Sequence, residues 1–134
     1  KKFKKIHQSI GTSPNLFGMK IAERAYAEGS QWLDQLLIYL EGNTSVFDKG
    51  IRNIPGLQSM KLHATYLAWV SFKNLGISEK EIVKRIHKDA RIVASIGSSF
   101  GTGGEGFMRF NLACPRSKIY EALSRLSLVF NDIQ

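Results

Sequence analysis

Three glycines, Gly101, Gly103 and Gly106, have the spacing G-x-G-x-x-G, which in dinucleotide-binding proteins lets a backbone loop approach a pyrophosphate. That chemistry requires the glycines to lie between a strand and a helix, so that the N-terminus of the helix meets the phosphates. Here an alternating, strand-like pattern follows the last glycine, and the sequence has no Gly-Lys-Ser/Thr motif. We therefore predict a tightly turned loop between two strands rather than a nucleotide site.

Arg109 follows this loop and is the candidate for binding a ligand. Apolar and polar side chains alternate between residues 107 and 113, so a strand would place Met108 and Phe110 on one face and Arg109 on the other. A guanidinium fixed on a strand suits bidentate recognition of a carboxylate. A structural ion pair would use the same residue, and the pattern alone favours that role.

The remaining reactive side chains form no complete catalytic set. The three histidines are far apart and have no acid at metal-ligand spacing, so we predict no metal site. Cys114 has no neighbouring motif that would activate its thiol, and Arg116 is expected to hold local carbonyls or to pair with an acid. The acidic residues of this region form no acid–base pair: Glu79, Glu81 and Glu105. We assign no catalytic residue to the chain.

The elements that must position these residues begin with helices. Apolar residues at helical spacing indicate helices over residues 1–10, 16–28 and 30–54. The third helix could break at Gly42-Asn43, and Pro55-Gly56 ends it. The same end is where we expect a helical arm to give way to a compact α+β unit.

After this point short β-rich segments appear. Strands are expected over four of them: 57–62, 65–72, 91–96 and 107–113. The second has two apolar faces and should therefore lie in the middle of a covered sheet. Ser78 to Glu81 matches a capping box, Ser at the cap and Glu three residues on, and Ser117 is expected to cap the last helix.

The composition is that of an ordinary globular domain. The chain has 134 residues, of which 43% are hydrophobic and 22% charged, and a net charge of +8. Positive charge favours a nucleic-acid partner, but apart from Lys1 to Lys5 the basic residues are scattered over helical patterns as solvated faces, so we expect no such partner. No apolar run approaches the roughly 20 residues of a membrane helix. No continuous apolar stretch follows the basic N-terminus, so we expect that it is not a signal peptide. One cysteine fits a reducing compartment, and we expect a cytoplasmic protein.

Several stretches occur in an order that is typical of one enzyme family. Residues Tyr26 to Leu36, continued by Tyr39 to Asn43, are similar to its A-Y-x-x-G-x-x-W-L-x-x-L segment. Thr65 to Trp69 is similar to the central strand of its small domain, and Gly97 to Arg116 is similar to its C-terminal signature. In these residues the chain resembles the MalY/PatB family of pyridoxal-phosphate (PLP) C–S lyases and aminotransferases.

The resemblance implies an α+β fold, the small C-terminal domain of the aspartate-aminotransferase-like PLP fold. That domain has a small, mostly antiparallel sheet packed by helices, with an N-terminal helical arm. Residues 1–29 would be a helical segment from the end of the large PLP-binding domain, 30–55 a long connecting helix, and 56–134 the small domain. Such enzymes are usually homodimers whose active sites lie at the subunit interface.

The family commonly cleaves the Cβ–S bond of cystathionine or cysteine conjugates by α,β-elimination, and its arginine before an Asn binds the α-carboxylate of the amino-acid substrate. Arg109 matches that position and is therefore the expected substrate-binding residue. An aminotransferase of the same fold would bind the α-carboxylate of its substrate through the same arginine. From a different class, a non-enzymatic basic binding module for an acidic ligand or nucleic acid remains the competing hypothesis.

The resemblance also implies which parts of the active site lie elsewhere. The family's PLP lysine belongs to a segment upstream of the region that matches Lys1, so we expect PLP in the full-length protein and none bound to this chain alone. Two residues depart from the family pattern. Ala64 stands where the family often has Gly, and Ser71 where it often has Asp, so the identity of the substrate stays open.

Overall fold

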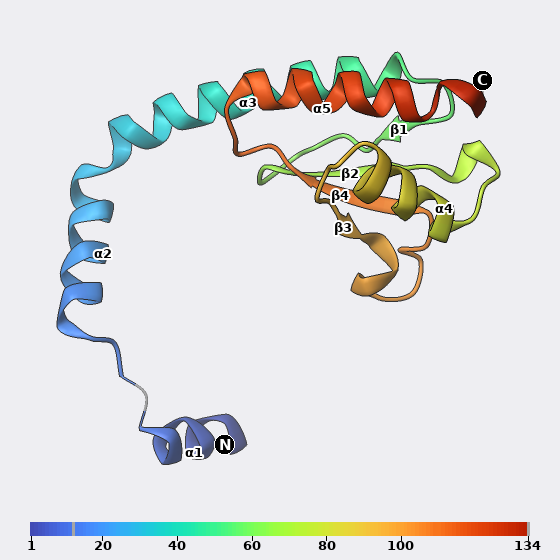
Figure 1. The fold of residues 1–134 in the computed structure, drawn as a ribbon. Helices are drawn as coiled ribbons and strands as arrows, with labels where there is room; N and C mark the ends of the chain where they lie inside the picture. Colours follow the sequence, from blue (N-terminus) through green and yellow to red (C-terminus); the bar gives the residue numbers. More distant parts are fainter. Residues whose placement is uncertain (12, 134) are drawn as a thin grey trace. The chain divides into compact units, whose positions relative to one another are not determined.

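A computed structural model of the protein describes residues 1–11 and 13–133. These described residues form two compact units, one up to residue 37 and one from residue 38 onward. The first unit contains α1 (Lys2–Ile10), α2 (Leu16–Glu28) and the first turns of α3 (Ser30–Arg52) (Figure 1). The second contains the rest of α3, a four-stranded sheet, and helices α4 (Glu79–Lys84) and α5 (Arg116–Val129). Within the described residues, no helix combines the length and the apolar character that crossing a membrane requires.

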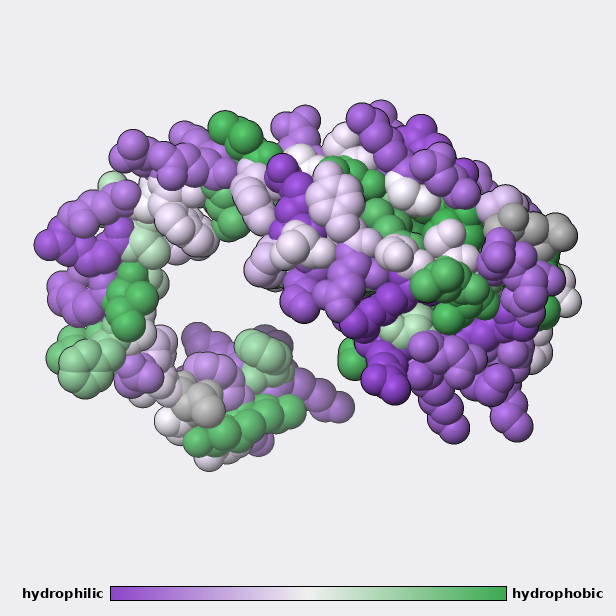
Figure 2. Space-filling model, turned by 45° about the horizontal axis from the view of Figure 1, so that its top comes forward, coloured by the Kyte–Doolittle hydropathy of each residue, from purple (hydrophilic) through white to green (hydrophobic). Residues whose placement is uncertain are grey.

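The helices of the first unit begin and end at the expected residues. Asn15 caps α2 by accepting a hydrogen bond from the Gly18 N–H at 2.7 Å, and Gly11 ends α1 in the left-handed conformation. No side chain within Lys2–Ile10 or Leu16–Glu28 is buried. Apolar and aromatic side chains therefore lie at the surface of this unit: Phe3, Ile6, Ile10, Leu16, Phe17, Ile21, Tyr26 and Trp32. Figure 2 shows green, hydrophobic side chains at the surface.

The sheet is antiparallel throughout and has the strand order β1-β2-β4-β3. Its strands are β1 (Gln58–Ser59), β2 (Leu67–Ser71), β3 (Ser95–Ile96) and β4 (Phe107–Asn111). β2 is a central strand, as its two apolar faces predicted, and it pairs with β4 so that Trp69 lies opposite Arg109 and Val70 opposite Met108. The predicted fold class, a small antiparallel sheet packed by helices, is confirmed.

The two edge strands are much shorter than predicted. The expected strand 91–96 is reduced to two residues because Arg91 takes a left-handed conformation, with φ at 54°, and the Ile92 N–H donates to the Ile86 carbonyl at 2.9 Å. That hydrogen bond ties the backbone to the preceding helical segment instead of the sheet. The expected strand 57–62 is likewise only β1, because the Leu57 N–H closes a turn onto Ile54.

The core lies against the face of the sheet that carries Val70 and Met108. Helix α5 runs beside the second half of α3 (Figure 1), and a Cβ at Gly50 of α3 would overlap the Leu123 side chain of α5, so the two helices pack closely. Fully or nearly buried side chains of α3, β2, β4, α5 and the segment around α4 form one cluster: Phe47, Ile51, Val70, Phe72, Ile82, Ile86, Met108, Phe110, Ile119, Leu126 and Phe130. Phe47 and Ile51 belong to this cluster, so the second half of α3 packs with the sheet in the unit that begins at residue 38.

Helix α3 does not break at Gly42-Asn43, contrary to the expectation from sequence. Asn43 is fully buried, and its Nδ2 donates to the Leu112 carbonyl at 2.9 Å and to the Cys114 carbonyl at 3.0 Å. Its Oδ1 accepts from Nε of Arg116 at 3.0 Å. The Asn43 side chain thus supplies hydrogen-bond donors to the backbone carbonyls in the segment between β4 and α5. It holds this segment against α3, and the helix continues past it.

The helix caps agree with the sequence at one end and differ at the other. Ser78 Oγ accepts from the Glu81 N–H at 3.3 Å at the start of α4, as the capping box predicted. Ser117, however, lies inside α5 and does not cap it. Pro115 is the N-cap residue, with an extended backbone, and the Lys118 N–H donates to its carbonyl at 2.9 Å. The helix therefore starts two residues earlier than a cap at Ser117 would place it.

Replacing Asn43 by Ala should destabilise the chain by about 2–3 kcal/mol, because two buried carbonyls and one guanidinium N–H lose their partners. Urea unfolding followed by circular dichroism would measure this. Asn53→Ala, at an exposed position just after α3, is the matched control and should change the free energy of unfolding by roughly 0.5 kcal/mol or less. Equal effects of the two substitutions would show that the Asn43 hydrogen bonds do not stabilise the fold.

Candidate substrate-binding site

Arg109 lies on the face of the sheet opposite the core, as the alternation of β4 predicted. Its Nη2 donates to Ser95 Oγ at 3.3 Å, and its Cζ lies 4.5 Å from the centroid of the Phe100 ring. The side chain is half-buried. Among the described residues no carboxylate lies within ion-pair distance of it, so the structural ion pair that the pattern favoured does not form. Arg109 therefore has one weak neutral hydrogen bond and one ring contact, and its charge lacks a counter-ion from this part of the chain.

The surface beside Arg109 is aromatic. The Trp69 ring packs edge-to-face against Phe100 and stacks on Phe107, each with centroids 5.6 Å apart. Nζ of Lys73 lies 4.6 Å from the centroid of the Phe107 ring. The site thus combines a fixed guanidinium with a wall of aromatic rings, which suits a ligand that has both a carboxylate and an apolar part.

The glycine-rich segment is a loop between antiparallel strands, as predicted. Gly97 to Phe100 forms a 3₁₀ turn directly after β3, and Gly101, Gly103 and Gly106 have positive φ. β4 follows the last glycine, so the loop does not have the strand–helix context of a dinucleotide site. A Cβ at Gly97 would overlap the Gly104 carbonyl oxygen, and a Cβ at Gly104 would overlap that of Gly97, so the two strands of the loop touch through their backbones.

A carboxylate outside the loop holds it at both ends. Glu79, the first residue of α4, accepts from Ser98 Oγ at 2.8 Å and from the Gly106 N–H at 3.2 Å. Glu79 is half-buried. Sequence reasoning included Glu79 only in a search for acid–base pairs, and its distance of about twenty-five residues from Gly106 left no local signal for this contact.

The turn ahead of β2 contains one departure from the family pattern. Ala64 precedes Thr65, which has a φ of 67°, an unusual value for a β-branched residue, and Thr65 Oγ1 accepts from the Leu67 N–H at 3.2 Å. Ser71, the other departure, accepts through Oγ from the Lys73 N–H at 3.4 Å at the end of the same strand. Both polar side chains therefore shape turns at the ends of β2.

Arg116 and Cys114 have structural roles, in line with the prediction. The Arg116 guanidinium lies over the Tyr39 ring, with Cζ 4.9 Å from the centroid, and Nη2 donates to the Tyr39 carbonyl at 3.2 Å in addition to the Asn43 contact. Cys114 is half-buried, and burial raises the pKa of its thiol, which disfavours the nucleophilic thiolate.

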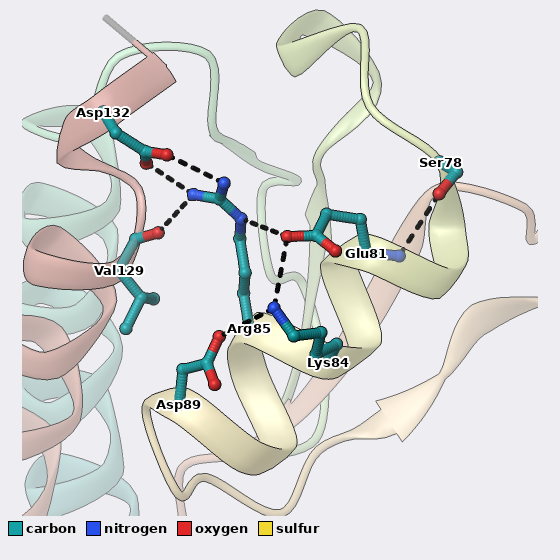
Figure 3. Close-up of polar contacts among 7 residues, drawn as sticks. All are labelled: Ser78, Glu81, Lys84, Arg85, Asp89, Val129 and Asp132. Atoms are coloured by element: carbon teal, nitrogen blue, oxygen red, sulfur yellow. Dashed lines mark hydrogen bonds and ion pairs between the residues drawn. The ribbon is translucent and has the colours of Figure 1, made fainter.

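A second cluster of charges lies around Arg85, away from Arg109 in the sequence. Figure 3 shows its guanidinium between Glu81 and Asp132: Nε donates to Glu81 at 2.9 Å, Nη2 to Asp132 at 2.8 Å and Nη1 to the Val129 carbonyl at 2.7 Å. These hydrogen bonds lower the pKa of both carboxyls and raise that of Arg85. Lys84 completes the cluster, 3.7 Å from Glu81. Lys84 also pairs with Asp89 at 3.6 Å, and the hydrogen bonds of Arg85 tie the C-terminal residues Val129 and Asp132 to the end of α4.

Metal-ligand residue types and lysines are the groups that could hold a metal ion or PLP. The described residues contain no group of three or more His, Cys, Asp or Glu side chains that could hold a metal ion. Every described lysine is exposed, so none is held in a pocket where an aldehyde cofactor could be enclosed. Of the residues predicted from sequence, the structure therefore places only Arg109 in a site suited to a small ligand, with Trp69 and Phe100 as neighbours that the sequence assigned to the core or did not single out.

Comparison with known proteins gives relatives over nearly the whole chain. No family model matches the sequence. The cystathionine beta-lyase PatB of Bacillus subtilis is 34% identical over 113 residues, 84% of this chain and 29% of that protein. The protein MalY of Escherichia coli is 34% identical over 116 residues, 86% of this chain and 30% of that protein. Cystalysin from Treponema denticola, whose crystal structure contains PLP, is 31% identical with a TM-score of 0.89, over 98% of this chain and 34% of that one. The chain spans about a third of the length of these proteins.

The Arg85 cluster should make the stability of the chain depend on pH in the acid range. The folded pKa values of Glu81 and Asp132 lie below their ordinary values of 4.5 and 3.8, so their contribution is present above those values and is lost as the pH falls through the folded pKa values. Asp132→Asn should reduce the loss of stability below pH 3.8. Urea unfolding of both proteins at a series of pH values would measure it.

Above about pH 6 both carboxyls are ionised in the folded and the unfolded chain, so the difference in stability between wild type and Asp132→Asn should there be constant. An identical acid dependence of the two proteins would contradict a role for the Arg85–Asp132 pair.

Proposed function

This chain belongs to the MalY/PatB family of PLP-dependent enzymes, and from this we propose that it forms the substrate-carboxylate side of the active site in a C–S β-lyase. The chain corresponds to a C-terminal portion of its relatives, about a third of their length, so the activity belongs to a longer protein. The substrates proposed are cystathionine and other cysteine S-conjugates, since the relative from Bacillus subtilis is a cystathionine beta-lyase.

The observation that supports this proposal most is the state of Arg109. Its guanidinium is held on a strand, beside aromatic rings, and has no carboxylate partner among the described residues. A half-buried cation without a counter-ion is costly unless a ligand supplies the negative charge. The α-carboxylate of an amino-acid substrate would do so through a bidentate, charge-assisted pair, and this pair would orient the Cα and Cβ atoms for reaction.

The aromatic wall extends this role beyond the carboxylate. Trp69 and Phe100 would exclude water from the Arg109–carboxylate pair, which strengthens an ion pair by lowering the local dielectric. Their apolar surface also suits a thioether side chain better than a charged one. The chain's own contribution to the reaction is therefore to bind and orient the substrate and to keep water from the bound carboxylate.

PLP, when bound, supplies the electron sink for α,β-elimination. The residues of this chain do not fit the cofactor alone, because every described lysine is exposed. We place the lysine and the phosphate ligands in the part of the longer protein that the relatives have and this chain does not match. An isolated chain would then be inactive.

The surface of the first unit supports a larger assembly. Its exposed apolar side chains are typical of a surface that is covered in the complete protein. We assign residues 1–29 to the end of the large PLP-binding domain, 30–55 to the connecting helix and 56–134 to the small domain. The complete enzyme would be a cytoplasmic homodimer, with neither nucleic acid nor membrane as a partner.

In the full-length enzyme, Arg109→Ala should lower kcat/KM for L-cystathionine roughly 30- to 1000-fold, about 2–4 kcal/mol, because a buried charge pair loses one partner. Assay of pyruvate release would measure it. Arg52→Ala, which removes an exposed cation paired with Asp48, is the control and should leave kcat/KM unchanged. Unchanged kinetics in Arg109→Ala would remove this residue from the site.

Formation of a 2-oxo acid that retains the substrate's sulfur, in place of pyruvate and a thiol, would assign the enzyme as an aminotransferase.

Residues 1–134 incubated with PLP and reduced with borohydride should show no stoichiometric adduct at a single lysine, because the described lysines are exposed and none is enclosed. Intact-mass and peptide mass spectrometry would detect one. The full-length enzyme, treated in the same way, should be labelled at one lysine outside residues 1–134. A single labelled lysine within the chain would refute the division of the active site proposed above.

A further inference from the structure

The guanidinium of Arg109 contacts its cross-strand partner on β3 and one residue of the glycine-rich loop. Both of its contacts, Ser95 Oγ and the Phe100 ring, come from the segment formed by β3 and the 3₁₀ turn that opens the loop. A hydrogen bond of 3.3 Å to a neutral hydroxyl is weak. The orientation of the guanidinium therefore depends on where the loop holds Phe100.

The loop's own hydrogen bonds are short-range. The Gly101 N–H donates to the Ser98 carbonyl, the Gly104 N–H to the Gly101 carbonyl and the Phe107 N–H to the Gly104 carbonyl. Gly101, Gly103 and Gly106 all have positive φ, and residues 99 to 103 are exposed. Phe100 is itself 52% exposed, so core packing does not fix it. Glycine backbones have more conformational freedom than others, so contacts from outside the loop help to hold one conformation.

Glu79 supplies those contacts. Its two carboxylate oxygens accept from Ser98 Oγ at 2.8 Å, two residues before Phe100, and from the Gly106 N–H at 3.2 Å, one residue before β4. One half-buried side chain of α4 therefore joins the beginning of the loop to its end. Hydrogen bonds to a charged acceptor are stronger than neutral ones, so this link adds to the neutral backbone hydrogen bonds of the loop.

We infer that Glu79 is a positioning residue for substrate binding: its carboxylate holds the 97–106 loop so that Phe100 keeps the Arg109 guanidinium aimed at the substrate carboxylate. This inference rests on the carboxylate-binding role proposed for Arg109. Glu79 does not touch the substrate, and its effect is confined to ligands that have a carboxylate. Through Glu79, helix α4 and the loop affect the affinity for the substrate without contacting it.

A pair of inhibitors that differ only by the α-carboxylate tests this in the full-length enzyme. L-norleucine and 1-aminopentane lack a leaving group at Cβ, and their inhibition constants against L-cystathionine cleavage measure binding with and without the carboxylate. Glu79→Ala should weaken L-norleucine roughly 2- to 30-fold, as expected for a residue that acts through another, and leave 1-aminopentane unchanged. For L-cystathionine the KM should rise more than kcat falls.

The conservative variant separates positioning from charge. In Glu79→Gln, Oε1 can accept from the Gly106 N–H while Nε2 donates to Ser98 Oγ, so this variant should restore most of the L-norleucine affinity. Glu105→Ala is the matched control, because Glu105 accepts only a local hydrogen bond from the Gly103 N–H at 3.0 Å within the same loop. It should leave both inhibition constants unchanged.

A double-mutant comparison shows whether Glu79 acts through Arg109. In an Arg109→Ala background, Glu79→Ala should have no further effect on L-norleucine. If Arg109→Ala leaves the preference for L-norleucine over 1-aminopentane intact, the proposed role of Arg109 fails. If Arg109→Ala abolishes the preference but Glu79→Ala weakens both inhibitors equally, or neither, only the inference about Glu79 fails. Should Glu79→Ala not fold, Ser98→Ala removes one of the two contacts, and a normal preference in that variant would overturn the inference.

Discussion

The antiparallel pairing of β2 with β4 is the constraint on which the other features depend. Each strand presents one face to the core and one to the opposite surface, so the register that places Val70 opposite Met108 also places Trp69 opposite Arg109. A slip by one residue in β4 would turn Arg109 into the core and Met108 out of it, at the cost of burying an unpaired charge. The hydrophobic effect thus fixes the position of a polar residue that it does not itself stabilise.

The sequence predicted those features that depend on local periodicity. The alternation from Phe107 to Asn111 located β4 and the orientation of Arg109, and the serine and glutamate of the capping box located the start of α4. The fold class followed from the same patterns, and the order of the resembling segments connected them to a family. These signals are contained within a few residues, so one sequence is enough to show them.

The features that sequence reasoning missed or misjudged depend on contacts between distant segments. A break at Gly42-Asn43 was possible from sequence, but the carbonyls that Asn43 satisfies lie about seventy residues further on. The edge strand predicted over 91–96 forms over only two residues, because the left-handed backbone of Arg91 turns the chain back onto a helical segment. The Arg85 cluster and the contacts of Glu79 likewise join segments that no spacing rule connects. At the candidate site, the periodicity of the sequence predicted which face of the sheet carries Arg109. The structure was needed to show that Arg109 has no carboxylate partner among the described residues.

The backbone contact between Gly97 and Gly104 limits how this enzyme surface could be redesigned. Any side chain at either position would push apart the two strands of the loop. Ser99 and Glu105 hydrogen-bond to the backbone of the same segment, so variation that preserves the loop is confined to exposed side chains without such contacts, such as that of Thr102. Substitutions at Thr102 would change the polarity and bulk of the exposed side of the loop while the turn beneath it stays the same. Larger changes in the shape of the loop would require a new loop length.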